Sequence, residues 1–168
     1  MNLDSLRVYG GRSVNAVRVL YLGPFAVTPV VDAKAAEWKS KLSRNLGATV
    51  ELITADPPFD VEDDPEGKGH WVRPYHPKEE SRRKLFRKQL FSSLVLLLTY
   101  VVKYQPAIIL GIEQGALIAA LSSLPLVLEA ACRARIVMAP EVAAIRRAWA
   151  GVVGVLAVNP RVIPGRSD

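Results

Sequence analysis

Short segments rich in apolar and β-branched residues alternate along this chain with longer helical segments. Strands that are apolar on both sides are buried on both faces, which is typical of a parallel sheet covered by helices. We therefore predict an α/β fold, a three-layer α/β/α sandwich with a mainly parallel, five-stranded sheet. The predicted strands are Val17–Leu22, Thr49–Thr54, Ala107–Leu110, Arg135–Met138 and Val152–Val158.

The segments between these strands have helical spacing of apolar residues or begin after a proline. Right-handed crossovers between parallel strands favour the strand order 2-1-3-4-5, with Leu6–Tyr9 as an additional edge strand. A chain of 168 residues fits one domain, so we treat residues 1–168 as a single unit. The predicted helices are Asp32–Asn45, Lys78–Tyr104, Ala116–Arg133 with an interruption at Pro125, and Glu141–Trp149.

The two longest apolar stretches argue against a membrane span. Leu90–Val102 and Ala116–Leu128 are each about thirteen residues long, whereas a spanning helix needs roughly twenty. The N-terminus has no apolar region typical of a signal peptide. Cys132 is the single cysteine, which excludes an internal disulfide and favours an inert core thiol. We expect a soluble protein of the reducing cytoplasm that does not enter a membrane.

The stretch Ala107–Leu121 has the strand–turn–helix pattern of a nucleophile elbow. Gly111 and Gly115 stand two positions before and after Glu113, which occupies the place of the nucleophile. Such a turn is tight, and glycines let the helix approach the strand closely. Gln114 would present its backbone N–H at the helix N-terminus as half of an oxyanion hole.

The run Gly111-Ile-Glu-Gln-Gly-Ala116 resembles the elbow Gly-Phe-Ser-Gln-Gly-Ala of the α/β-hydrolase fold, and more narrowly of small serine hydrolases of the Fsh type, which are phospholipase/carboxylesterase-like. Arg18–Pro24 is similar to the first strand of that family, and Ala55–Phe59 to the turn after its second strand. The resemblance covers about residues 17 to 140. It implies an α/β-hydrolase-like domain whose ligand-binding residues are Gly23, Pro24, Glu113 and Gln114.

Three parts of the hydrolase machinery do not match the family. Glu113 replaces the serine, and its longer side chain misplaces an attacking oxygen. Pro24 has no N–H to donate to an oxyanion. The base histidine of this fold follows the last strand, but His70 and His76 both follow the second strand. Glu141 is a candidate acid by position only. We therefore predict a catalytically inactive, serine-hydrolase-like pseudoenzyme that acts as a binding or structural module.

Glu113 leaves three hypotheses open. Its carboxylate can cap the following helix and so close the old active site. A retained pocket can bind a small molecule without turning it over. In the third hypothesis Glu113 is the general base of a hydrolase with altered chemistry. None of these requires a cofactor.

The long loop Ala55–Pro77 holds both histidines. Loop histidines are usually exposed, and no recognised zinc spacing is present, so we predict no metal site. Trp71 and Phe59 are expected to fold back over the sheet edge as a lid.

The formal net charge is +6, and Lys78–Lys88 forms a basic run. The favoured interpretation is the solvated first half of a helix. A nucleic-acid-associated accessory domain is the alternative from a different class, and it would bind with a steep salt dependence. The basic side chains involved would be those of the run together with Arg44, Arg133, Arg135, Arg146 and Arg147.

No further strand is predicted beyond Val158, so one edge of the sheet is left open. An open edge pairs readily with another chain. We expect either a homodimer that covers exposed apolar surface or a domain excised from a larger polyprotein.

Overall fold

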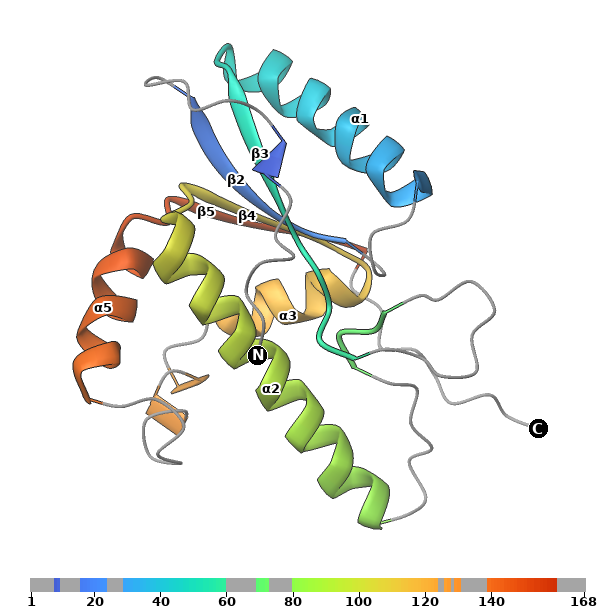
Figure 1. Cartoon of the computed structure of the whole chain (residues 1–168), viewed down its shortest axis with the longest axis vertical. Helices are drawn as coiled ribbons and strands as arrows, with labels where there is room; N and C mark the ends of the chain where they lie inside the picture. Colours follow the sequence, from blue (N-terminus) through green and yellow to red (C-terminus); the bar gives the residue numbers. More distant parts are fainter. Residues whose placement is uncertain are drawn as a thin grey trace.

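The computed structural model describes residues 8–9, 16–23, 29–59, 69–72, 80–123, 126–127, 129–130 and 139–159. In these residues a five-stranded sheet has the order β1-β3-β2-β4-β5 (Figure 1). The strands are β1 (Val8–Tyr9), β2 (Val17–Leu22), β3 (Val50–Ala55), β4 (Ile108–Ile112) and β5 (Gly154–Val158). The helices are α1 (Pro29–Leu46), α2 (Glu80–Tyr104), α3 (Gln114–Ser122) and α5 (Ala139–Ala150).

Strands β3, β2, β4 and β5 are parallel, and β1 adds an antiparallel edge, as predicted for the Leu6–Tyr9 region. The first three predicted strands have the expected order. The last one, however, pairs directly with the third, because Ile108–Ile112 matches Gly154–Val158 in register. The place predicted for Arg135–Met138 between them is therefore wrong, and that segment itself lies outside the described residues.

Helices cover both faces of the sheet (Figure 1). On one face, residues of α1 such as Ala35 and Leu42 pack against Val19 and Leu52. On the other face, α2, α3 and α5 pack against side chains of the opposite parity, Leu20, Ile53 and Ile109 among them. Burial on both faces explains why the central strands are apolar almost throughout.

Helix α2 is the one described helix that is long and apolar enough, over Lys84–Tyr104, to cross a membrane by length and composition. The same test is passed by the core helix of a soluble protein. Here Leu97 and Val101 are fully buried in the main core cluster. The apolar half of α2 thus packs inside the domain, and the helix does not indicate a membrane protein.

Candidate functional site

The turn between β4 and α3 is as tight as the sequence pattern predicts. Only Glu113 separates Ile112, the last residue of β4, from Gln114, the first residue of α3. Glu113 has φ 53° and ψ −110°, a conformation that side-chain-bearing residues rarely adopt. Its N–H donates to the carbonyl of Val158 at 3.0 Å, which ties the turn to β5. A strained backbone of this kind costs about 1–3 kcal/mol and is concentrated at functional sites.

The two glycines of the turn are required by contact between backbones. A Cβ at Gly111 would lie 2.3 Å from the carbonyl oxygen of Gly115, and a Cβ at Gly115 would lie 2.2 Å from the carbonyl oxygen of Leu22. Real Cβ atoms essentially never come so close. The first turn of α3 therefore lies directly against β4 and against the end of β2.

Glu113 does not cap α3 with its side chain. It stands at the N-cap position, but it makes no side-chain cap hydrogen bond. The hypothesis that its carboxylate caps the helix and so closes the old site is therefore wrong. The positive φ of Glu113 differs from the extended backbone usual at an N-cap. Glu113 is a half-buried residue that directly follows the carboxyl end of β4.

Gln114 has a side-chain role that the sequence analysis missed. The residue is 4% exposed, and its Oε1 accepts hydrogen bonds from the N–H groups of Trp71 at 3.1 Å and Val72 at 3.3 Å. Its Nε2 lies 3.5 Å from Nδ1 of His70. The partners are more than forty residues away along the chain. No local sequence pattern reports such a contact.

Segment 69–72 lies across the carboxyl ends of the strands. Trp71 is fully buried; its Nε1 donates to the carbonyl of Gly23 at 2.8 Å, and its own carbonyl accepts a hydrogen bond from Ser93. His70 is also buried and exchanges backbone hydrogen bonds with Phe59, so the expectation of an exposed loop histidine is wrong for this residue. Trp71 folds back as predicted, but it is a core residue rather than a superficial lid.

The structure describes only some of the other candidate residues. Gly23 is buried at the end of β2, with its carbonyl bound to Trp71. Pro24, His76 and Cys132 lie outside the described residues. Glu141 belongs to α5, but its side chain is not among the parts that the structure describes. No group of three or more His, Cys, Asp or Glu residues suited to a metal occurs in the described part of the chain.

Two buried hydroxyl groups lie on the face of the sheet that α1 covers. Tyr21 and Thr54 are register partners on β2 and β3, 0% and 3% exposed, and neither hydroxyl has a hydrogen-bond partner in the described structure. The pKa of Tyr21 is raised to about 12, first by burial and second by the carboxylate of Glu113. The phenol therefore lies within electrostatic reach of that carboxylate and stays protonated at neutral pH.

We expect two tyrosines to ionise late in an alkaline titration. Burial is also the main cause that raises the pKa of Tyr100 to about 12. Between about pH 10 and 12 the folded chain then binds more protons than the unfolded chain, so stability is lost as the pH rises through this window. The effect is at most about 3 kcal/mol per tyrosine. Ultraviolet absorbance of tyrosinate measures the ionisation.

Tyr21→Phe and Tyr100→Phe serve as the controls for that titration. Each is expected to remove one late-ionising group and to leave the other in place. If all tyrosines of the folded native chain ionise together near their usual pKa, the burial of both phenols is incorrect.

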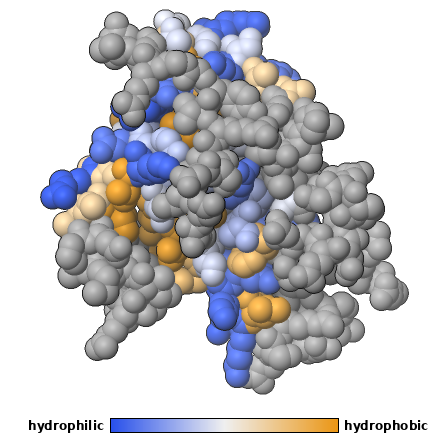
Figure 2. Space-filling model, viewed as in Figure 1, coloured by the Kyte–Doolittle hydropathy of each residue, from blue (hydrophilic) through white to orange (hydrophobic). Residues whose placement is uncertain are grey.

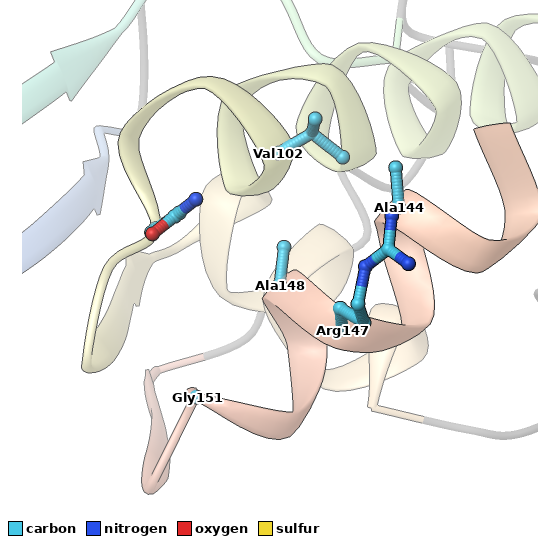
Figure 3. Close-up of a pocket in the computed structure, with 6 residues that line it drawn as sticks. Val102, Ala144, Arg147, Ala148 and Gly151 are labelled. Atoms are coloured by element: carbon cyan, nitrogen blue, oxygen red, sulfur yellow. The ribbon is translucent and has the colours of Figure 1, made fainter.

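A cavity of about 430 Å³ lies between α2 and α5, away from the elbow. Its lining residues Gln105 and Gly151 precede β4 and β5, so it lies near the opposite ends of the strands. Figure 3 shows the small side chains of Ala144 and Ala148 on α5 facing α2, with Arg147 beside them. Arg147 is the one charged residue among its described lining residues, and these residues supply no pair of groups for acid–base chemistry.

The basic residues do not gather on one surface in the part described. Lys84, Arg87 and Lys88 are exposed on the first half of α2, where Figure 2 shows hydrophilic residues beside an apolar patch. Arg44 is on α1, which covers the other face of the sheet, and Arg146 is on α5. This distribution lends no support to a single nucleic-acid interface.

Comparison of the chain with protein-family models, with curated proteins and with solved structures finds no match. The function of the chain is therefore inferred from the geometry of the elbow and of the residues around it.

Proposed function

We propose that this chain is an α/β-hydrolase-like domain, similar to serine hydrolases of the Fsh type, that binds a small molecule at the former active site without hydrolysing it. The finer architecture belongs to the same proposal: a three-layer α/β/α sandwich with a further parallel strand at Arg135–Met138. A single cysteine is consistent with a reducing, cytoplasmic compartment. In the described sheet β5 is an edge strand, and such an edge can pair either with that further strand or with a second copy of the chain in a homodimer.

One observation carries the proposal: Glu113 keeps a strained elbow conformation although its carboxylate does not cap α3. The positive φ of Glu113 is unfavourable for folding. That the chain nevertheless has this conformation favours a functional role for the Glu113 side chain. A glutamate at this position cannot form the acyl-enzyme of a serine hydrolase. A carboxyl group at this position that does not act as the nucleophile is suited to binding a ligand.

Among the residues that the structure describes, no histidine near Glu113 is placed as the general base of a serine-type reaction. His70 is the one histidine in the described residues, and it lies beside the side chain of Gln114 within a buried backbone bridge to Phe59. A base must come within hydrogen-bond reach of the proton that it removes. Restoring the serine alone is therefore not expected to restore hydrolysis.

Hydrolysis of short p-nitrophenyl esters tests the proposal, with the native chain compared with Glu113→Ala and Glu113→Ser. None of the three is expected to release p-nitrophenol faster than the uncatalysed reaction. Turnover by the native chain that Glu113→Ala abolishes would contradict the proposal and make Glu113 a catalytic group, as the altered-chemistry hypothesis requires. Turnover gained in Glu113→Ser would show that a working base is present.

A further inference from the structure

The cavity between α2 and α5 is lined by one face of each helix end. On the side of α5 and the turn after it, the lining residues follow one another at positions i, i+3, i+4 and i+7: Ala144, Arg147, Ala148 and Gly151. Residues three or four apart on a helix lie on the same face. Val102 and Gln105, on the side of α2, have the same spacing. Both helices therefore turn a continuous face toward the cavity.

Small side chains leave this space between two helices that otherwise pack closely. Leu98 of α2 and Ile145 of α5 are both buried and belong to one apolar cluster. Ala144 and Ala148 each have only a methyl group, and Gly151 has no side chain. The described side chains therefore leave about 430 Å³ unfilled, although protein interiors are normally close-packed. This volume is within the range of roughly 300–1,000 Å³ that is usual for ligand pockets.

Two polar side chains line the cavity, those of Arg147 and Gln105. Figure 3 shows the guanidinium group of Arg147 beside Ala144. Among the residues that the structure describes, no carboxylate forms an ion pair with Arg147. Gln105 directly follows α2 with φ 47°, a position after a helix that glycine usually occupies. A glutamine there adds an amide group to the lining of the cavity.

The charges around the cavity favour an anion. The C-termini of α2 and α5 both lie beside it, and each carries about half a negative charge. Arg147 contributes one full positive charge, and Lys103 and Arg146, which are next to lining residues in the sequence, contribute two more nearby. The sum is positive. A guanidinium group also matches the planar shape of a carboxylate, to which it can donate two parallel hydrogen bonds.

We propose that this cavity binds a small organic carboxylate. Its carboxylate group would be held by Arg147, and its apolar chain would contact Val102, Ala144 and Ala148. The amide of Gln105 offers donors and an acceptor for a further polar group of the ligand. The site is separate from the elbow, because Gln105 precedes β4 whereas Glu113 follows it. It therefore does not depend on the function proposed for Glu113.

Nuclear magnetic resonance titration of the native chain with hexanoate, hexanol, hexylammonium and inorganic phosphate tests the assignment. Hexanoate is expected to shift the backbone amide signals of Val102, Gln105 and Gly151 in a saturable way, with a Kd in the millimolar range because the ligand is small. Hexanol retains the apolar chain but not the charge, so it should bind about fivefold or more weakly. Hexylammonium is repelled by Arg147, and phosphate has no apolar part, so neither should give saturable shifts.

Two variants remove the two halves of the site, and each has a neighbour as its matched control. Arg147→Gln is expected to weaken hexanoate binding by about fivefold or more, because a charge-assisted but partly hydrated contact is lost. Arg146→Gln removes an adjacent exposed charge that does not line the cavity, so it should change the affinity much less.

Ala144→Leu fills the cavity and is expected to weaken hexanoate binding by about tenfold or more, because the new side chain occupies the place of the ligand. Ala143→Leu adds the same atoms at an exposed neighbouring position that does not line the cavity, and should leave binding unchanged. Circular dichroism establishes that each variant is folded before it is titrated.

Weaker binding in Arg147→Gln and Ala144→Leu, with both controls similar to the native chain, would support the carboxylate site. The site is incorrect if hexanoate gives no saturable shifts, or if Arg147→Gln and Arg146→Gln weaken binding equally. Phosphate that binds at the same amides as tightly as hexanoate would indicate an adventitious ion only and overturn the ligand class. Ester turnover that depends on Glu113 would contradict the function proposed for the elbow but not this site.

Discussion

Gly111→Ala is expected to lower the free energy of unfolding by about 3 kcal/mol or more, near the upper end of what overpacking does. The new Cβ would lie 2.3 Å from the Gly115 carbonyl oxygen and 2.6 Å from the Cα of Ala116. Both obstacles are backbone atoms in the first turn of α3, so no side chain can move aside to make room. Urea unfolding followed by circular dichroism measures the loss.

Gly154→Ala is the matched control for this change. A Cβ at Gly154, in the neighbouring strand β5, meets nothing within 4 Å. The same chemical change there should alter stability by less than about 1 kcal/mol. If Gly111→Ala and Gly154→Ala have equal effects, the close approach of α3 to β4 is wrong, and with it the tight elbow.

Gly115→Ala tests the contact between α3 and β2. Its Cβ would lie 2.2 Å from the Leu22 carbonyl oxygen, so the clash is with β2 rather than β4. Destabilisation by both alanine variants would mean that α3 is held between two strands. The helix then has no freedom to relieve the strain at Glu113, which explains how an unfavourable backbone conformation persists.

Trp71→Ala is expected to lower the free energy of unfolding by about 3–5 kcal/mol, the range for truncating a large aromatic core residue. Trp71 is fully buried in the main core cluster, and its indole N–H binds the carbonyl of Gly23. The alanine variant leaves a large cavity beneath segment 69–72 and an unpaired carbonyl at the end of β2. Thermal and urea unfolding measure the change.

Trp71→Phe separates the two contributions. Phenylalanine retains much of the apolar volume but cannot donate to Gly23, so its effect should be smaller than that of alanine. Trp38→Ala is a further control, because Trp38 is only partly buried, on α1 at the other face of the sheet. An effect of Trp71→Ala no larger than that of Trp38→Ala would show that segment 69–72 is not part of the core.

The contacts of segment 69–72 also affect how the site is understood. Gln114 uses both ends of its side-chain amide to hold this segment, and Ser93 of α2 holds it from the other side. The side chain of Gln114 therefore has a structural role, because it holds segment 69–72 in place. The proposed binding role therefore depends on Glu113 rather than on the side chain of Gln114.

Much of the fold was predictable because its signals are local. The apolar composition of Val17–Leu22 and the helical spacing in Asp32–Asn45 each report burial within one segment. The parallel order of the first three strands followed from the handedness of crossovers. The place of Arg135–Met138 was predicted wrongly because strand adjacency depends on which segments pair, and β5 pairs with β4 directly.

Sequence by itself determined the elbow, because the spacing of Gly111, Glu113 and Gly115 between an apolar strand and a helix is a pattern within five residues of the chain. Tertiary structure alone decided what surrounds it. The hydrogen bond from Trp71 to Gln114 joins residues 43 apart, and Tyr21 and Thr54 become register partners only when β2 and β3 align. The physical reason is that a partner for a buried polar group is chosen by the packed chain as a whole, whereas a backbone turn is constrained by its own residues.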